Sequence, residues 1–231
     1  MTSWIGLTEK QPVLTRILIN SIEKNRISHA YLFQGGKGTG KQEMAIHLAK
    51  TVFCQQRQGV EPCQECSDCK RIDSGNHPDL HFVEPDGASI KKDQILYLQK
   101  EFTYSGLESD RKVYIIKDAE RMTTNASNRL LKFLEEPSRE TVAILLTENS
   151  HAILDTIRSR CQIMSFRPLV EKGVENALTE HGVSESSAKL FAMLTSNIEQ
   201  AIEWSNDEEF AQTRKLVVQL NEMLRQNPGD V

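Results

Sequence analysis

The chain has 231 residues, of which 39% are hydrophobic and 26% charged, and its net charge is −4. This composition is ordinary for a globular protein, and no low-complexity tract argues for disorder. The length accommodates one large domain or two smaller ones. The acidic balance excludes tight DNA binding through overall positive charge, so any DNA contact must be local or shared with a partner.

We expect no export signal, because residues 1–10 lack a basic flank followed by an apolar segment. No apolar run is long enough to span a bilayer. A cytoplasmic protein is expected, without a membrane partner. In that reducing compartment the five cysteines are expected to be metal ligands or buried thiols, not disulfides.

A strand, a loop and a helix are predicted in succession near the N-terminus. The apolar run at residues 30–33 stops at a glycine-rich segment, residues 35–40, as a buried strand entering a turn does. The apolar residues that follow recur at the spacing of one helical face: Ala45, Leu48, Ala49 and Val52.

Further apolar runs bounded by turn or charged residues are typical of buried parallel strands. They cover residues 80–83, 113–116 and 142–146, and a strand-like segment covers 163–166. Two apolar stripes between them predict helices, the second of which ends before Pro137. The stripes are Ile95, Leu98 and Phe102, and then Ala126, Leu130, Phe133 and Leu134. This alternation predicts a doubly wound α/β domain with a parallel sheet.

A second domain is predicted after Pro168, because strand signals stop there. The remaining periodicity is helical, in Ile198, Ala201 and Ile202 and over residues 210–224. We therefore expect a P-loop domain over residues 1–167, with a cysteine-containing insert at about 54–78. A small helical lid domain is expected over residues 168–231.

The glycine-rich segment and the residue after it, residues 35–41, fit the phosphate-loop pattern G-x-x-x-x-G-K. In this pattern Gly35 and Gly40 let backbone N–H groups approach phosphates, and Lys41 reaches the outer ones. The next position normally carries a hydroxyl that ligates Mg²⁺, but here it is Gln42, whose neutral amide is a poor substitute. The pattern predicts a P-loop fold with a degenerate site.

An acid follows the run at residues 113–116 in the place of a Walker B aspartate, namely Asp118. The next position, where a catalytic ATPase of the AAA+ kind carries a water-orienting glutamate, is Ala119. Glu120 lies one residue further, where only an irregular turn could bring it back, and we interpret it as an exposed surface acid. These residues predict a chain that does not hydrolyse ATP.

Four cysteines form the strongest metal signal in the sequence: Cys54, Cys63, Cys66 and Cys69. Two successive C-x-x-C steps let neighbouring thiolates close on one tetrahedral ion, which predicts a structural zinc site with no open position for water. His77 and His81 lie nearby, but four thiolates already satisfy zinc. Both histidines are interpreted as surface or packing residues.

These features, together with several short motifs, resemble the delta-prime family of subunits of the bacterial DNA polymerase III clamp loader. The motifs are His-Ala-Tyr-Leu-Phe at residues 29–33, the four-cysteine insert, Leu-Leu-Lys-Phe-Leu-Glu-Glu-Pro at 130–137 and Ser-Arg-Cys at 159–161. The resemblance runs essentially end to end. It implies an AAA+ fold.

The resemblance also implies a role for Arg160, since the arginine of this Ser-Arg-Cys motif projects into the ATP site of the neighbouring subunit. A planar, permanently charged guanidinium suits contact with a γ-phosphate, which makes Arg160 the candidate arginine finger acting in trans. Arg158 is a nearby competitor. Cys161 is interpreted as a buried core thiol.

Two further motifs of the family match this chain loosely. Thr147 and Asn149 fall where the family has its sensor-1 polar residue. In the sensor-2 segment, Glu199 occupies the position of the phosphate-binding arginine, and its charge would repel a triphosphate. Gln42, Ala119 and Glu199 therefore all indicate a chain that does not hydrolyse ATP.

We expect a non-hydrolysing clamp-loader subunit that stacks beside an ATP-binding motor subunit and also meets a delta-type subunit. Through the complex it would act on the sliding clamp and primer-template DNA. The family's collar domain does not fit before Val231, so we expect a fragment or a shortened chain. Two alternatives remain open: a catalytic loader ATPase that tolerates Gln42, and a zinc-containing DNA-binding module with a local basic patch from Lys37, Lys91 or Lys92.

Overall fold

The computed structural model describes residues 2–103, 111–135 and 141–226. The chain divides into two compact units, Met1–Pro168 and Leu169–Val231. The division follows Pro168, where the strand signals in the sequence stop. None of the described helices combines the length and the apolar character needed to cross a lipid bilayer.

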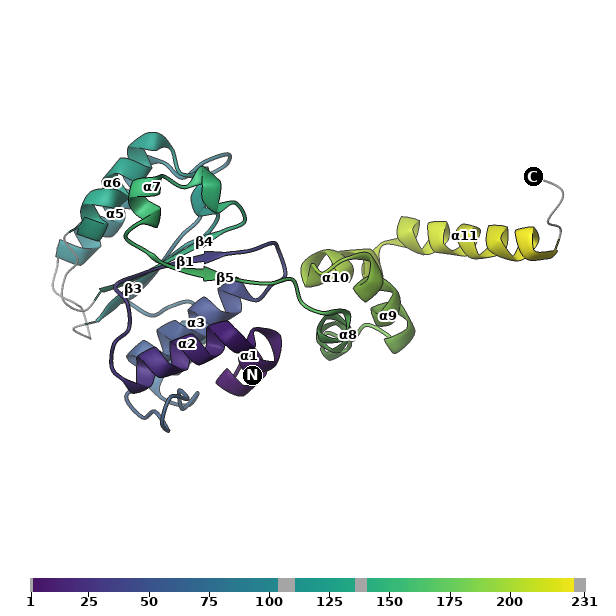
Figure 1. The fold of residues 1–231 in the computed structure, drawn as a ribbon, viewed down its shortest axis with the longest axis horizontal. Helices are drawn as coiled ribbons and strands as arrows, with labels where there is room; N and C mark the ends of the chain where they lie inside the picture. Colours follow the sequence, from purple (N-terminus) through teal and green to yellow (C-terminus); the bar gives the residue numbers. More distant parts are fainter. Residues whose placement is uncertain (1, 104–110, 136–140, 227–231) are drawn as a thin grey trace. The chain divides into compact units, whose positions relative to one another are not determined.

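The described part of unit 1 contains a five-stranded sheet of order β2-β3-β4-β1-β5 (Figure 1). The strands are β1 (Ala30–Gln34), β2 (Leu80–Val83), β3 (Lys112–Ile116), β4 (Thr141–Thr147) and β5 (Gln162–Ser165). Every neighbouring pair is parallel. The predicted parallel sheet is confirmed: β2 has the predicted bounds, and the ends of β1, β3, β4 and β5 each differ from the predicted runs by at most one residue.

Helices cover both faces of this sheet. They are α1 (Trp4–Lys10), α2 (Pro12–Glu23), α3 (Lys41–Phe53), α4 (Ser67–Asp73), α5 (Lys92–Thr103), α6 (Thr124–Glu135) and α7 (Asp155–Arg158), with short 3-10 turns η1 (Ala119–Arg121) and η2 (Ser150–Ala152). Figure 1 shows α1, α2 and α3 on one face and α5, α6 and α7 on the other. This two-sided cover is the doubly wound arrangement.

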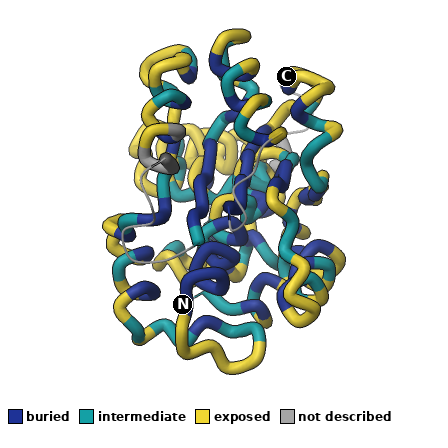
Figure 2. The backbone as a smooth tube through the Cα atoms, turned by 90° about the vertical axis from the view of Figure 1, so that its left-hand side faces the viewer, coloured by how far each residue is buried: buried dark blue, intermediate teal, exposed yellow. Residues whose placement is uncertain are grey.

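Side chains that alternate along each strand pack into two separate hydrophobic cores, one on each face of the sheet. Tyr31 and Phe33 of β1 lie in the core with α1, α2 and α3, whereas Leu32 lies in the core with α5, α6 and α7. All three are fully buried. Dark blue stretches of the tube in Figure 2 mark buried residues of this kind. Because both faces of the sheet are covered, its strands are continuous apolar runs in the sequence.

The predicted helical stripes are buried where the structure describes them. In α3 all four stripe residues are buried, and in α5 Ile95 and Leu98 are buried. In α6 the ring of Phe133 is only partly buried and lies 5.1 Å from that of Tyr114, centroid to centroid. The side chain of Phe102 and the residue Pro137 lie outside the described residues.

Unit 2 is helical in its described part, as predicted. Its helices are α8 (Glu171–Glu180), α9 (Glu185–Leu194), α10 (Ile198–Asn206) and α11 (Glu208–Gln226). A small core gathers Val174, Leu178 and Phe191, and the rings of Trp204 and Phe210 stack with centroids 5.5 Å apart. The described residues after Pro168 thus form helices and no strand, in agreement with the loss of strand signals there.

Candidate functional site

The phosphate loop joins the end of β1 to the start of α3. A Cβ atom on Gly35 would lie 2.8 Å from the carbonyl oxygen of Phe166, so no larger residue fits there without a shift. Gly40 caps α3 with a left-handed φ of +86°, which L side chains rarely adopt. Both predicted glycine positions are therefore required by the shape of the loop.

Lys41 folds its side chain back across the loop, where its ammonium group donates to the carbonyl oxygens of Gly35 and Gly36. Burial lowers the pKa of Lys41, while the carboxylates of Glu148, Glu120 and Asp118 oppose that shift. The lysine thus lies where phosphates meet a P-loop, among acids from the ends of β3 and β4. Gln42, beside it, is exposed.

The chain beyond β3 differs from what the sequence indicated. Lys117 still donates its N–H to Val83, and Asp118 then takes a left-handed conformation at φ +46° that turns the chain into η1. Ala119 is buried, as a methyl group at this turn can be. The turn brings Glu120 back toward the sheet, where its Oε1 accepts the N–H of Glu148 at 3.1 Å. The interpretation of Glu120 as an exposed acid is wrong, because the side chain is half-buried and one of its oxygens is engaged.

A shallow hollow opens beside the phosphate loop, at the carboxyl ends of β1, β4 and β5. Its lining consists of Gln34, Gly35, Glu148, Asn149, Ser150, His151, Ser165 and Phe166. The hydroxyl of Thr147 accepts the N–H of Asn149, and the Asn149 amide oxygen in turn accepts the N–H of His151. Both sensor-1 candidates thus hold the wall of the hollow. Glu199 is exposed in the first turn of α10.

The four cysteines converge, since their sulfur atoms all lie within 4.8 Å of one another. Cys54 ends α3, and Cys66 caps α4 by accepting the N–H of Cys69. The sulfurs of Cys54 and Cys66 are 4.0 Å apart, close to the ~3.8 Å edge of a tetrahedron whose metal–sulfur bonds are about 2.3 Å. The donor set therefore fits one tetrahedral thiophilic ion.

Backbone N–H groups support the sulfurs as ligands. The N–H of Cys63 points to the sulfur of Cys54 at 3.2 Å, and that of Cys66 to the sulfur of Cys63 at 3.3 Å. Hydrogen bonds from the N–H groups of Glu65 and Cys66 lower the pKa of Cys63 to about 7. Burial raises the pKa of Cys69, so an ion must displace the proton of that thiol.

The two nearby histidines do not join the cluster of sulfurs. His77 is buried, its ring centroid lies 4.1 Å from that of Phe53, and its Nδ1 accepts the N–H of Asp79. The packing interpretation of His77 agrees with these contacts. His81 is half-buried within β2.

Arg160 lies between α7 and β5, with 36% of its side chain exposed. Its guanidinium pairs with the carboxylate of Glu135 at 2.8 Å and donates to the carbonyl oxygen of Thr156, also at 2.8 Å. Arg158 instead pairs with Asp155. Cys161 is half-buried against the core, and burial raises its pKa to about 12.

Three supporting residues were given no role by the sequence analysis. Gln11 is buried and donates to the carbonyl oxygens of Thr39 in the phosphate loop and Arg167. Glu61 and Glu135 contact α1 and Arg160 respectively. Their partners are far away in the sequence, so no local spacing could have found them.

A five-stranded parallel sheet, with a glycine-rich loop from β1 into a helix, followed along the chain by a helical unit, defines the chain as a P-loop protein of the AAA+ kind. The family described as "DNA polymerase III, delta subunit" matches residues 10–170. The chain is 54% identical to the delta-prime subunit of DNA polymerase III from Bacillus subtilis, over 98% of this chain and 69% of that protein. The chain belongs to the delta-prime family of DNA polymerase III subunits.

Other relatives share only part of their length with this chain. The tau subunit of DNA polymerase III from Bacillus subtilis is 34% identical over 85% of this chain and 37% of its own. A crystal structure of a gamma-subunit-related protein from Thermotoga maritima superimposes with a TM-score of 0.58 at 26% identity, covering 81% of this chain and 56% of that one. The predicted fold class and family are confirmed by these likenesses.

Proposed function

We propose that this chain is a clamp-loader subunit that does not hydrolyse ATP and that donates Arg160 to nucleotide bound by a neighbouring motor subunit. In the cytoplasm it would stand between that motor subunit and a delta-type subunit. Through the assembled loader it would help to place the sliding clamp on primer-template DNA. Membership of the delta-prime family supports this assignment.

The position of Arg160 in the sheet carries the proposal. It lies two residues before Gln162, which pairs with Tyr31 near the start of β1. The phosphate loop follows Gln34 at the other end of that five-residue strand, roughly 15 Å further along the sheet. Arg160 thus lies near the amino ends of β1 and β5, whereas the loop with Lys41 follows the carboxyl end of β1. Arg160 is out of reach of its own loop but available to a site on another subunit.

Two contacts prepare Arg160 for such a role. Glu135 and the carbonyl of Thr156 hold its guanidinium at a half-exposed position. An arginine held in one direction loses less side-chain entropy when it meets a phosphate. Exposed ion pairs are weak, so a γ-phosphate can replace Glu135 at little cost.

The absence of hydrolysis is supported by the residues around Lys41. Gln42 offers an amide where Mg²⁺ needs a hydroxyl, and Ala119 has no carboxylate to orient water. Glu120 comes closest to replacing that carboxylate, but one of its oxygens already accepts the N–H of Glu148. The phosphate loop therefore keeps its glycines and lysine but lacks the hydroxyl that ligates Mg²⁺ and the carboxylate that orients water.

We also assign the four-cysteine cluster to structural zinc. Four thiolates satisfy a tetrahedral Zn²⁺ completely, which leaves no position for substrate or water. When bound, zinc would join the end of α3 to α4 and stabilise the excursion between them.

The test is Arg160→Ala in a loader reconstituted with the motor and delta-type subunits. Loss of a finger costs about 10³–10⁵ in rate, or roughly 4–7 kcal/mol, at the site that faces it. Other active sites in the ring would keep their activity, so the bulk rate falls less. The measurement is clamp- and DNA-stimulated ATPase activity together with clamp loading.

Arg158→Ala is the matched control, because Arg158 pairs with Asp155 on the same helix and should matter less. Wild-type ATPase and clamp loading in the Arg160→Ala loader would show that Arg160 is not a finger. Failure of that loader to assemble would make Arg160 an interface residue instead.

A further inference from the structure

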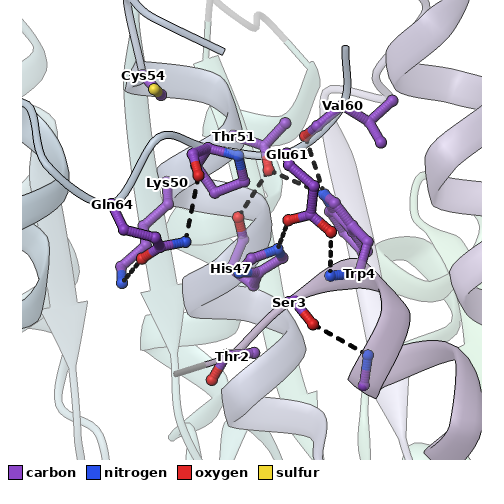
Figure 3. A network of polar contacts seen from close by, with 12 residues as sticks. Thr2, Ser3, Trp4, His47, Lys50, Thr51, Cys54, Val60, Glu61 and Gln64 are labelled. Carbon is purple, nitrogen blue, oxygen red and sulfur yellow. Dashed lines mark hydrogen bonds and ion pairs between the residues drawn. The ribbon is translucent and has the colours of Figure 1, made fainter. Parts of the chain in front are cut away.

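The segment between α3 and α4, residues 54–66, is called the cysteine excursion here. One of its carboxylates, that of Glu61, accepts a hydrogen bond from the first helix, α1. Glu61 lies between Cys54 and Cys63, and its Oε1 accepts the N–H of Trp4 at 2.7 Å (Figure 3). Its Oε2 lies 3.3 Å from Nε2 of His47, which is buried in α3. One side chain thus contacts both α1 and α3.

Trp4 is held by the same excursion from a second direction. Its indole N–H donates to the carbonyl oxygen of Val60 at 3.1 Å and lies 3.2 Å from the hydroxyl of Thr51 (Figure 3). The side chain is 1% exposed and lies edge-on to the ring of His47. Since α1 has only seven residues, its stability must come from such tertiary contacts.

The other end of α1 reaches the phosphate loop. Gln11 ends the helix and is 4% exposed, and its amide donates to Thr39 at 3.1 Å and to Arg167 at 2.7 Å. Lys10 pairs with Glu43 in the first turn of α3 at 2.8 Å. Helix α1 therefore spans from the cysteine excursion to the loop that carries Lys41.

The cysteine excursion is also bonded to the last turn of α3 through Lys50. Lys50, which is 6% exposed, places its ammonium 2.8 Å from the amide oxygen of Gln64 and 2.6 Å from Asp73. Residues 55–59, by contrast, are exposed. The segment that carries Glu61 is fixed at its two ends by Cys54 and Cys63, and between them Gln58 and Glu61 exchange backbone hydrogen bonds while Val60 packs, partly buried, against the core.

We propose that the four-cysteine module positions α1, and through α1 the phosphate loop, with Glu61 as the connecting residue. The inference rests on the metal site proposed above. A metal closes the segment from Cys54 to Cys63 into a loop, which lowers the conformational entropy that this segment has without the metal. The carboxylate of Glu61 is then fixed where it accepts the N–H of Trp4. With α1 held in this way, the amide of Gln11 stays in contact with the carbonyl oxygen of Thr39.

Trp4 supplies a direct probe, because Trp204 is the only other tryptophan in the chain. In a Trp204→Phe background, zinc is removed with a chelator and then restored. We expect zinc removal to shift the Trp4 emission to the red and increase its quenching by acrylamide, and re-addition of zinc to reverse both changes. Zinc content is measured by elemental analysis on the same samples.

Variants of Glu61 separate its role from that of the metal. Glu61→Ala should bind zinc with unchanged stoichiometry yet show the Trp4 emission of the zinc-free protein. Glu61→Gln, which keeps an oxygen acceptor, should restore much of the native emission. The matched control is Glu65→Ala, since Glu65 is an exposed glutamate between two cysteines of the same module.

Hydrogen exchange at residues 35–40 tests the second half of the connection. We expect faster exchange there after zinc removal and in Glu61→Ala, and wild-type exchange in Glu65→Ala. Unchanged Trp4 emission in Glu61→Ala, or after removal of zinc that had been bound, overturns the inference alone. Unchanged exchange in the loop overturns the connection from α1 to the loop. Absence of bound zinc from wild-type protein overturns the metal site and the inference together.

Discussion

The phosphate loop and the four-cysteine module lie at opposite ends of one helix, and they differ in how much of their chemistry is present. Helix α3 begins at Lys41 and ends before Cys54, thirteen residues or about 20 Å later. The module has four converging thiols, which is a full ligand set. The loop keeps Gly35, Gly40 and Lys41 but has Gln42 after them. The loop therefore keeps the shape of the motif, although the residue after Lys41 lacks the hydroxyl that normally ligates Mg²⁺.

The first way to break this comparison is to remove one ligand of the complete site. In Cys66→Ala we expect zinc content to fall from about one per chain to near zero, because three thiolates and no fourth ligand hold zinc poorly. The free energy of unfolding should fall by several kcal/mol, since zinc binding contributes to folding. Elemental analysis and urea unfolding measure the two effects.

Cys161→Ala is the control, as this thiol packs against the core far from the module in sequence. It should leave zinc content unchanged. Zinc retained in full by Cys66→Ala, or absent from wild-type protein prepared without chelator, would contradict the assignment.

The second prediction sharpens the comparison by testing the buried middle of α3. Burial lowers the pKa of His47 to about 4, well below the usual 6.5. Between these values the unfolded chain binds a proton that the folded chain does not, so stability present above pH 6.5 is lost as the pH falls toward 4. Wild type should therefore lose about 2 kcal/mol more than His47→Gln between pH 7 and pH 5.

Urea unfolding of both proteins at the two pH values measures this difference, with zinc content checked at each. Because the comparison is between two chains with the same four cysteines, the pH dependence of metal binding cancels. Equal losses in wild type and His47→Gln would show that His47 is protonated in the folded protein, where the neighbouring Glu61 carboxylate would stabilise its charge.

The sequence predicted the parts of the fold that follow from local pattern. Buried strands such as β3 and β4 are continuous apolar runs, and the C-x-x-C steps alone placed the thiols together. Helices α1 and α2 were not predicted, although Pro12 at the first position of α2 is a recognised start signal. For α1 the reason is physical, since its seven residues depend on contacts with Glu61 and Val60, far along the chain.

The candidate site shows the same limit. The phosphate-loop residues could be named from spacing, but the interpretation of Glu120 failed, because it depended on the backbone turn at Asp118. A left-handed aspartate has no reliable sequence signal. Likewise Glu135 and Gln11 act through partners that only the folded sheet brings near. Spacing predicts which atoms one segment presents, but not what another segment places opposite them.

The last prediction tests the incomplete site and has the smallest expected effect. The isolated chain should show no ATP turnover above background, and Lys41→Ala should therefore change nothing measurable. In an active P-loop protein the same substitution removes the cation that holds the outer phosphates, so its effect would be large. The measurement is steady-state ATPase activity for this chain alone, the motor subunit alone and their mixture. Turnover by the isolated chain that disappears in Lys41→Ala would show that the loop supports hydrolysis despite Gln42 and Ala119. The loop would then be as complete as the cysteine module. Stimulation confined to the mixture would place the chemistry in the neighbouring subunit, as the role proposed for Arg160 predicts.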